Sequence, residues 1–191
     1  MNSNKRFSEN PVDDIEKVFL THDEIVKICE RIGNEINRDY HGKTPLIIGL
    51  LRGCIPFMAE LIKHITIKME YDFMEVESYF GGTHSSHTIS IKKDISTDLR
   101  GRHILIVDDI IDTGLTLKTI CAMLNERGVA STSIITLLDK PEGRNINGIN
   151  ADYVGSIIPK AFVVGFGLDY CQLYRNLPFI GVLKERVYHD E

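Results

Sequence analysis

The segment from residue 104 to residue 116, ILIVDDIIDTGLT, constrains the fold of this chain more than any other. It overlaps an apolar run, residues 103–107, of the kind that forms a strand covered on both faces, and we expect that strand to end at Asp108. Apolar positions at helical spacing follow, which predicts a helix. This succession of strand, acidic loop and helix is typical of an α/β protein with a mainly parallel, twisted sheet flanked by helices.

The same alternation continues along the rest of the chain. Thr21 and Glu24 form a capping-box pattern that predicts the start of a helix, and the short apolar run 45–51 predicts another buried strand. Pro56 suits the first turn of a further helix. Additional strands are expected at about residues 71–78, 88–92, 131–138, 153–158 and 162–164, the first two on either side of a Gly/Ser-rich excursion.

Length and composition limit the class of protein. At about 150 residues per domain, the length predicts a single domain over residues 1–191, with a polar extension at residues 1–14 that lacks the apolar stretch of a secretory signal. A hydrophobic fraction of 43% excludes disordered and collagen-like classes, and a net charge of −5 argues against a general nucleic-acid binder. No run approaches the roughly 18 apolar residues of a membrane span. The four cysteines are widely spaced, which favours buried, reduced thiols in a cytoplasmic protein.

The turn between the strand and the helix has the composition of a phosphate-binding loop. Gly114 lets the backbone approach a ligand closely, and Thr113 and Thr116 supply hydroxyl donors. The helix N-terminus adds free N–H groups and a partial positive charge. Ligands of open α/β sheets bind beyond the carboxyl ends of the strands, where this turn is expected. It is not a Walker A loop, because no lysine follows a second glycine.

Three carboxylates beside a phosphate site need a separate explanation, because they would repel the phosphate. Asp108 and Asp109 have the chemistry to accept hydrogen bonds from sugar hydroxyls or to hold Mg²⁺ through oxygen ligands. Asp112 is placed to exchange a proton with a bound base. The alternative is a strand that ends in solvated acids before an ordinary capped helix.

The decapeptide VDDIIDTGLT resembles the phosphoribosyl-diphosphate binding motif of the type I phosphoribosyltransferases. Residues 44–182 are similar to one subfamily, the hypoxanthine-guanine phosphoribosyltransferases, through four motifs in the family's order. The resemblance implies the family fold, with a small hood built from the chain ends and a mobile catalytic lid at about residues 78–90. It also implies purine salvage, in which phosphoribosyl diphosphate and hypoxanthine or guanine give IMP or GMP and pyrophosphate, with Mg²⁺ as the cofactor.

The resemblance also implies a role for each matching residue. Leu51, Arg52 and Gly53 match the loop that holds the diphosphate through its backbone, with Arg52 where many members carry lysine. Ser78 and Tyr79 match the base of the lid. The residues that match the ribose and 5′-phosphate site are Asp108, Asp109, Asp112, Thr113, Gly114, Leu115 and Thr116. Within that set, Asp112 resembles the general base at purine N7.

The remaining matches concern the purine and the leaving group. Lys140 matches the donor to the 6-oxo group, Phe162 the ring that stacks on the purine, and Val163 the backbone that reads its edge. Asp169 matches a purine-site residue that also holds a second Mg²⁺, the first being supported by Asp108 and Asp109. Arg175 matches the catalytic arginine that reaches the diphosphate.

The resemblance further implies a homodimer or homotetramer that binds neither nucleic acid nor membrane. One alternative is a nucleotide-sensing regulatory protein on the same fold, which typically adds a winged helix or a basic RNA-binding face. Another is the kinase that makes phosphoribosyl diphosphate, which needs two such domains and a longer chain. We expect the last residues, 188–191, to be a polar tail.

Overall fold

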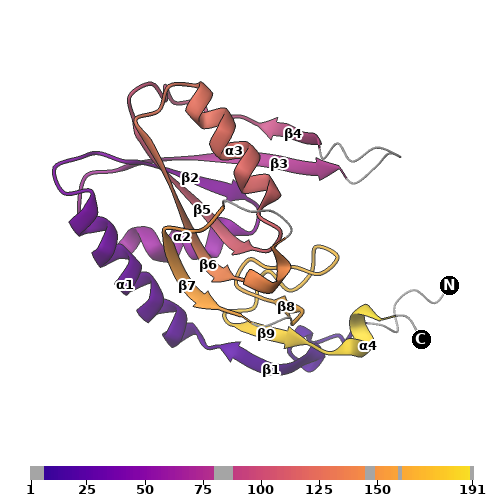
Figure 1. Ribbon diagram of the computed structural model, residues 1–191. Coiled ribbons are helices and arrows are strands. Elements are labelled where there is room, and N and C mark those ends of the chain that lie inside the picture. The colour runs from indigo at the N-terminus through magenta and orange to yellow at the C-terminus, as the bar shows by residue number, and fades with distance from the viewer. Residues whose placement is uncertain (1–6, 80–87, 145–148, 159–160, 190–191) are drawn as a thin grey trace.

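A six-stranded sheet in the order β4-β3-β2-β5-β6-β7 forms the centre of the protein, and a three-stranded sheet, β1-β9-β8, packs beside it (Figure 1). The computed structural model describes residues 7–79, 88–144, 149–158 and 161–189. The strands are β1 (Ile15–Leu20), β2 (Leu46–Leu51), β3 (Glu70–Tyr79), β4 (Thr88–Lys93), β5 (His103–Ile111), β6 (Ser131–Asp139), β7 (Tyr153–Ile157), β8 (Val163–Val164) and β9 (Ile180–Leu183). The helices are α1 (His22–Asp39), α2 (Cys54–Leu61), α3 (Leu115–Glu126) and α4 (Glu185–Tyr188), with short 3-10 turns at Pro11–Asp14, Ile62–His64 and Pro141–Gly143.

The central sheet confirms the predicted α/β fold. Strands β3, β2, β5, β6 and β7 are parallel, and only β4 runs antiparallel, as the return strand of the β3–β4 hairpin. The prediction that β5 ends at Asp108 is wrong. Pairing continues along β6 to Ile110 with Leu138 and Ile111 with Asp139, so the two acids 108 and 109 lie within the strand.

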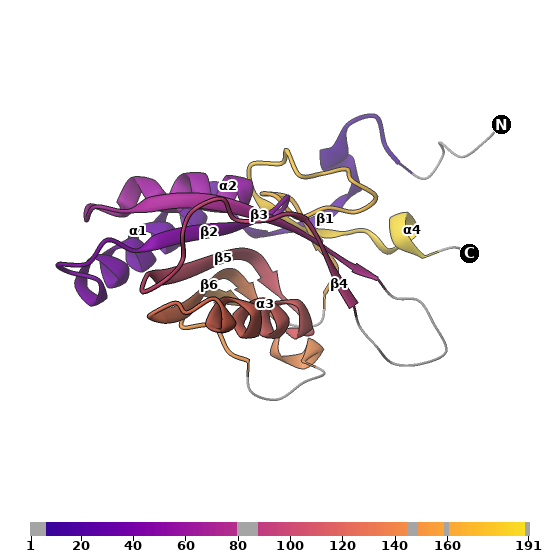
Figure 2. The same cartoon turned by 90° about the horizontal axis from the view of Figure 1, so that it is seen from above.

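Helices cover both faces of the central sheet (Figure 2). Helix α1 begins with the predicted capping box, in which the Thr21 hydroxyl oxygen accepts from the Glu24 N–H at 3.3 Å and Thr21 N–H donates to the Glu24 carboxylate at 2.8 Å. Helices α1 and α2 lie on one face, and α3 lies on the other. Alternate strand residues serve the two layers, so Ile47 and Leu105 face α1 and α2 while Ile48 and Ile106 face α3.

The second sheet joins parts of the chain that are far apart in sequence. Strand β1 pairs with β9, with Ile15 beside Leu183, and β9 pairs with β8. Asp14, just before β1, is fully buried, and its carboxylate accepts a hydrogen bond from the Tyr174 hydroxyl at 2.7 Å. The N-terminal extension is therefore part of the packed structure from Phe7 onward, because the Phe7 ring contacts the Tyr174 ring and the Ser8 N–H donates to Asp14 at 3.0 Å.

Cysteines and apolar side chains divide between the core and the surface. Cys29 and Cys54 are buried, and burial raises the pKa of each thiol to about 12. Cys171 is exposed, so the expectation of buried thiols is wrong at that position.

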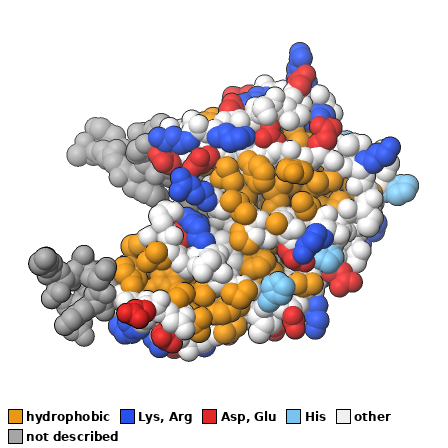
Figure 3. Space-filling model, turned by 180° about the vertical axis from the view of Figure 1, so that it is seen from behind, with side chains coloured by type: hydrophobic (Ala, Val, Ile, Leu, Met, Phe, Trp, Pro, Cys, Tyr) orange, Lys and Arg blue, Asp and Glu red, His pale blue; other side chains and the backbone are white. Residues whose placement is uncertain are grey.

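None of the described helices is long and apolar enough to cross a membrane. Figure 3 shows broad hydrophobic patches on the face behind that of Figure 1. The exposed large hydrophobic side chains are Val12, Val18, Ile55, Tyr71, Ile91, Ile157, Phe162 and Leu173.

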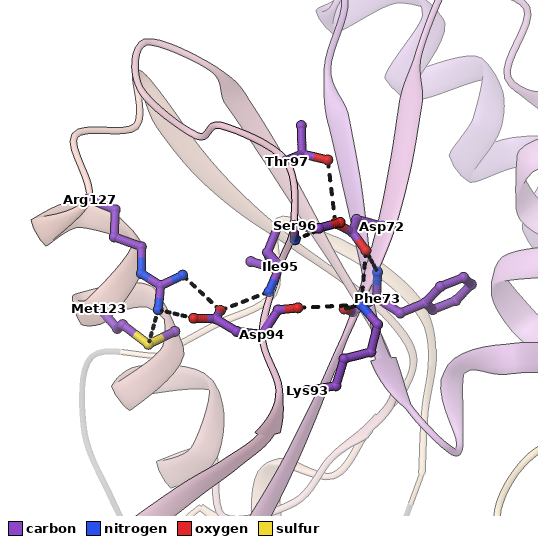
Figure 4. A network of polar contacts seen from close by, with 9 residues as sticks. All are labelled: Asp72, Phe73, Lys93, Asp94, Ile95, Ser96, Thr97, Met123 and Arg127. Carbon is purple, nitrogen blue, oxygen red and sulfur yellow. Dashed lines mark hydrogen bonds and ion pairs between the residues drawn. The ribbon is translucent and has the colours of Figure 1, made fainter.

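A polar network fixes the base of the β3–β4 hairpin (Figure 4). The Asp72 carboxylate, on β3, accepts from the N–H groups of Phe73 at 2.7 Å and Ser96 at 2.8 Å, and from Lys93 Nζ at 3.1 Å. Burial opposes the charge on Asp72, but these hydrogen bonds outweigh burial and hold its pKa well below its usual range. The segment after β4 is thereby tied to the central sheet.

Replacing Asp72 with asparagine is expected to lower the free energy of unfolding at pH 7 by about 2 kcal/mol, the typical value of hydrogen bonds to a charged group. Because the folded-state pKa is depressed, this stabilisation is complete above the unfolded-state pKa of about 3.9 and is lost as the pH falls toward the folded-state value. Urea unfolding at pH 7 and pH 3 measures both quantities. Asp98→Asn, at a side chain that is 68% exposed, is the matched control and should change stability little. An equal Asp72→Asn effect at both pH values would contradict the charge-based explanation.

Candidate active site

Strand β5 and the loops that carry Gly53 and Gly167 meet at the carboxyl edge of the central sheet, and the two glycines allow the contact. A Cβ atom added to Gly53, after β2, would lie 1.8 Å from the Asp109 Oδ2 atom of β5. A Cβ atom on Gly167 would lie 1.9 Å from the Gly53 carbonyl oxygen, and Gly167 has a φ of +103°. Neither position has room for a side chain. The predicted diphosphate loop, acidic pair and Asp169 loop are therefore in direct contact.

The predicted diphosphate loop presents its backbone to the site and its charged side chain to solvent. The Arg52 side chain is 63% exposed, and its Nε atom lies 3.4 Å from the Glu75 carboxylate of β3. The peptide bond between Leu51 and Arg52 is cis. Gly53 is followed at once by α2, which begins at Cys54, so the first turn of this helix starts at the same edge of the sheet.

Asp108 and Asp109 form a closely coupled acidic pair at the end of β5. Burial raises the pKa of Asp108 well above its usual range, and repulsion from Asp109 raises it further. Burial also raises the pKa of Asp109, although the nearby Arg175 guanidinium acts in the opposite direction. Two adjacent carboxylates that are costly to ionise favour a bound cation or hydrogen-bond donor beside them.

The predicted phosphate cradle lies at the start of α3. Gly114, with a φ of +78°, is the residue before the first helical turn, and the Leu115 N–H donates to Thr113 Oγ1 at 3.4 Å. A hollow of about 170 Å³ opens over this turn. Its lining residues are Asp108, Ile110, Ile111, Asp112, Thr113, Gly114, Thr116 and Leu117.

A second, larger cavity of about 360 Å³ adjoins the cradle. It shares Ile110 and Asp112 with the hollow over the cradle. Its lining residues are Asp109, Ile110, Asp112, Lys140, Ala161, Phe162, Val163, Leu168 and Asp169. The structure thus brings together the predicted base, the predicted 6-oxo donor and the predicted stacking ring. Asp112 lies between this cavity, whose lining is both charged and apolar, and the hollow over the cradle.

The segment after β6 wraps around Asp112. Lys140 Nζ lies 3.8 Å from Asp112 Oδ2, and a Cβ atom on Gly143 would lie 1.8 Å from Asp112 Oδ1. Sequence reasoning missed Arg144, whose guanidinium donates to the carbonyl oxygens of Ile111 at 2.9 Å and Asp112 at 3.0 Å. Arg144 also forms an ion pair with the Asp139 carboxylate, at the end of β6. A lone arginine in a loop carries no sequence signal for such contacts, which hold the backbone of the Asp112 loop.

Asp169 lines the cavity and forms an ion pair with Arg175. The Arg175 guanidinium lies 2.6 Å from Asp169 Oδ1 and donates to the Gly167 carbonyl oxygen at 2.7 Å. Asp169 also accepts from the Gln172 N–H at 2.9 Å. The pair therefore shapes the loop that packs on Gly53, beside the acidic pair.

Ser78 and Tyr79 lie in the last two positions of β3. This strand extends past the end of β2, because Leu51 pairs with Glu75 and β3 continues to Tyr79. The predicted lid residues 80–87 lie outside the described residues. The base of the predicted lid is therefore at the carboxyl edge that carries the acidic pair.

Comparison with known proteins agrees with this geometry. Residues 17–171 match the phosphoribosyl transferase domain family. The chain is 57% identical over 177 residues to the hypoxanthine-guanine phosphoribosyltransferase of Streptococcus pneumoniae, covering 93% of this chain and 98% of that protein. It is 54% identical to the Lactococcus lactis enzyme of the same name, covering 92% and 94%.

A solved structure supports the same assignment. The crystal structure of a hypoxanthine phosphoribosyltransferase from Staphylococcus aureus superimposes with a TM-score of 0.90 at 46% identity, covering 96% of this chain and all of that chain. Both the sequence and the fold therefore match over nearly the whole length. The chain belongs to the phosphoribosyl transferase domain family and, within it, to the hypoxanthine-guanine phosphoribosyltransferases.

Proposed function

We propose that this enzyme acts in purine salvage by transferring the 5-phosphoribosyl group from phosphoribosyl diphosphate to N9 of hypoxanthine or guanine. The products are IMP or GMP and pyrophosphate. The observation that carries the proposal is the pair of adjoining cavities that share Asp112. One has the loop and helix N-terminus that suit a 5′-phosphate, and the other has the aromatic and apolar lining that suits a purine.

Each end of the reacting system has its own residues. Purine N9 forms a bond to ribose C1′ as the C1′–oxygen bond to pyrophosphate breaks, so positive charge develops on the sugar and negative charge on the leaving group. Arg175 and the backbone of the loop formed by Leu51, Arg52 and Gly53 stabilise that negative charge. Asp112 accepts the proton that leaves purine N7 as the bond to N9 forms. Phe162 stacks on the purine, with the Val163 backbone at its edge, and the lid that begins at Ser78 and Tyr79 excludes water from the cationic sugar.

Magnesium fits the donors at this site. Among the described residues there is no cluster of three or more metal-type side chains, but Mg²⁺ is commonly held by one or two carboxylates together with substrate phosphates. Asp108, Asp109 and Asp169 are the carboxylates in place to serve it. When bound, Mg²⁺ would neutralise charge on the diphosphate.

One assay tests this function. The protein is incubated with phosphoribosyl diphosphate, Mg²⁺ and each of hypoxanthine, guanine, xanthine and adenine, and nucleotide formation is followed. We expect product from hypoxanthine or guanine and loss of activity with EDTA. Tight nucleotide binding without product from any base would support the nucleotide-sensing regulator instead, and activity that survives EDTA would refute the role of Mg²⁺.

Replacing Lys140 with alanine is expected to lower kcat/KM for hypoxanthine by about 10- to 100-fold, the loss of one hydrogen bond from a charged donor. Adenine has no 6-oxo group, so the low kcat/KM for adenine should change little. The ratio of kcat/KM for hypoxanthine to that for adenine should therefore fall. Steady-state kinetics with both bases measure the ratio. Lys27→Ala, on the exposed face of α1, is the control. An unchanged ratio would assign Lys140 a role other than reading the 6-oxo group.

Two further properties are part of the proposal. The hydrophobic patches of Figure 3 support a homodimer or homotetramer, because large exposed apolar patches mark interaction surfaces. Light scattering on the purified protein gives the mass directly. The four free cysteines support a reducing, cytoplasmic location.

A further inference from the structure

We propose that Tyr188, in the short C-terminal helix, is a positioning residue for purine binding that holds the Phe162 ring in place from outside the cavity. The proposal rests on the proposed function, in which Phe162 is the stacking surface for the base. The proposal also explains the role of the buried Asp14, which anchors the segment that carries Tyr188. The expected polar tail is thus wrong at its first residue.

Two tyrosine rings fix the orientation of Phe162. The Tyr188 ring stacks on it, with ring centroids 4.8 Å apart and an angle of 19° between planes. The Tyr170 ring meets it edge-on, at 5.3 Å and 89°. Both are favourable aromatic geometries. Phe162 is 38% exposed and lines the 360 Å³ cavity, whereas Tyr188 is not among the described lining residues.

Tyr188 depends on distant contacts for its own position. Helix α4 spans only Glu185–Tyr188, too short to be stable without packing. Lys184, which precedes it, donates its N–H to the Asp14 carbonyl oxygen at 2.9 Å. Arg186 places its guanidinium on the Asp14 carboxylate, and Val187 is fully buried.

Asp14 is the central residue of this anchor. Its carboxylate accepts from Ser8 Oγ at 2.6 Å, from the Tyr174 hydroxyl at 2.7 Å and from Arg186. Burial opposes the charge, but these hydrogen bonds outweigh burial and keep the pKa of Asp14 below its usual range. The N-terminal extension and α4 therefore form one unit behind the stacking ring.

A half-exposed phenylalanine that must be ordered on binding lowers affinity for the base. Ordering one such side chain costs about 0.5–1.5 kcal/mol, or about 2- to 10-fold in a dissociation constant. The stack with Tyr188 removes this cost before the purine arrives. The benefit applies to the base, because Tyr188 stacks on Phe162, whereas the groups proposed for phosphoribosyl diphosphate lie on β2 and the loop after it, on β5, at the start of α3 and at Arg175.

The test compares Tyr188→Ala with Tyr188→Phe, which keeps the ring. We expect Tyr188→Ala to raise KM for hypoxanthine by about 5- to 10-fold, with KM for phosphoribosyl diphosphate and kcat within about twofold of wild type. Tyr188→Phe should restore the wild-type KM. Tyr71→Ala, at a 57% exposed aromatic residue of β3, is the matched control. Tyr188→Leu keeps apolar volume without the ring and replaces the alanine variant if that variant does not fold.

Three results would overturn the proposal. The first is an unchanged KM for hypoxanthine in Tyr188→Ala. The second is an equal rise in the KM values for hypoxanthine and phosphoribosyl diphosphate, which indicates a merely structural residue. The third is a fall in KM for hypoxanthine, which indicates that Tyr188 competes for the stacking surface. A wild-type protein that forms no nucleotide refutes the proposed function instead. In that case, calorimetric titration of IMP into wild type, Tyr188→Ala and Tyr188→Phe tests the role of Tyr188. Equal dissociation constants would exclude a role for Tyr188 in base binding.

Discussion

Replacing Asp112 with asparagine is expected to lower kcat by about 100-fold or more, within the range that general acid–base groups contribute. The asparagine side chain has nearly the same shape, so the contacts with Gly143 and Arg144 persist, but an amide does not take up a proton. Asp112 is shared by both cavities of the site, where a group acting on the base must lie. Steady-state kinetics with hypoxanthine measure the effect.

The expected pattern for Asp112→Asn is a loss of turnover without loss of binding. KM for phosphoribosyl diphosphate and the dissociation constant of IMP should stay within a few-fold of wild type. Asp23→Asn, on the exposed first turn of α1, controls for the loss of one negative charge. Equal turnover in purified Asp112→Asn protein would refute the assignment of this residue as the base.

Replacing Gly53 with alanine is expected to lower kcat/KM by about 100-fold, the typical cost of an ångström-scale displacement in an active site. The new methyl group would lie 1.8 Å from Asp109 Oδ2, so the loop, the carboxylate or both must move. Gly167 would move with them, because its own Cα lies against the Gly53 carbonyl group. The predicted diphosphate loop, the acidic pair and the Asp169 loop would then no longer keep their positions relative to one another.

Gly42→Ala separates activity from stability in this comparison. Gly42 has a φ of +75° and open space around its Cα, so alanine there adds backbone strain but no contact near the site. We expect this control to lower the melting temperature while kcat/KM stays near wild type. Wild-type activity in Gly53→Ala would show that the close packing of the Gly53 loop, strand β5 and the Gly167 loop is not required for catalysis.

Local signals predicted the elements that local chemistry determines. The capping box at Thr21 and the buried strand ending at Leu51 needed no knowledge of distant residues, and both are confirmed. The predicted end of β5 at Asp108 was wrong. Carboxylates usually stop a buried strand, but hydrogen bonding to β6 extends this one to Ile111. The sequence of one strand does not determine how far it pairs with its neighbour.

The candidate site divides in the same way. The Asp-Thr-Gly pattern around Asp112 carries its chemistry in consecutive residues, so the cradle and its acids were visible in the sequence. Arg144 and Tyr188 were not, because an arginine in a loop or a tyrosine near a chain end is ordinary until its partners are known. Their partners, the Asp112 carbonyl group and the Phe162 ring, lie elsewhere in the chain, just after β5 and just before β8.

The sheet that joins β1 to β9 sets an order of events during synthesis. Asp14 leaves the ribosome 160 residues before Tyr174, and at about 5–20 residues per second it waits roughly 10–30 s for that hydroxyl. By the end of this interval the six strands of the central sheet and the turn before α3 have emerged, whereas β9 and α4 have not. A nascent chain is therefore able to form the predicted cradle first, and Phe162, the proposed stacking ring, gains its support only after Arg186 has emerged.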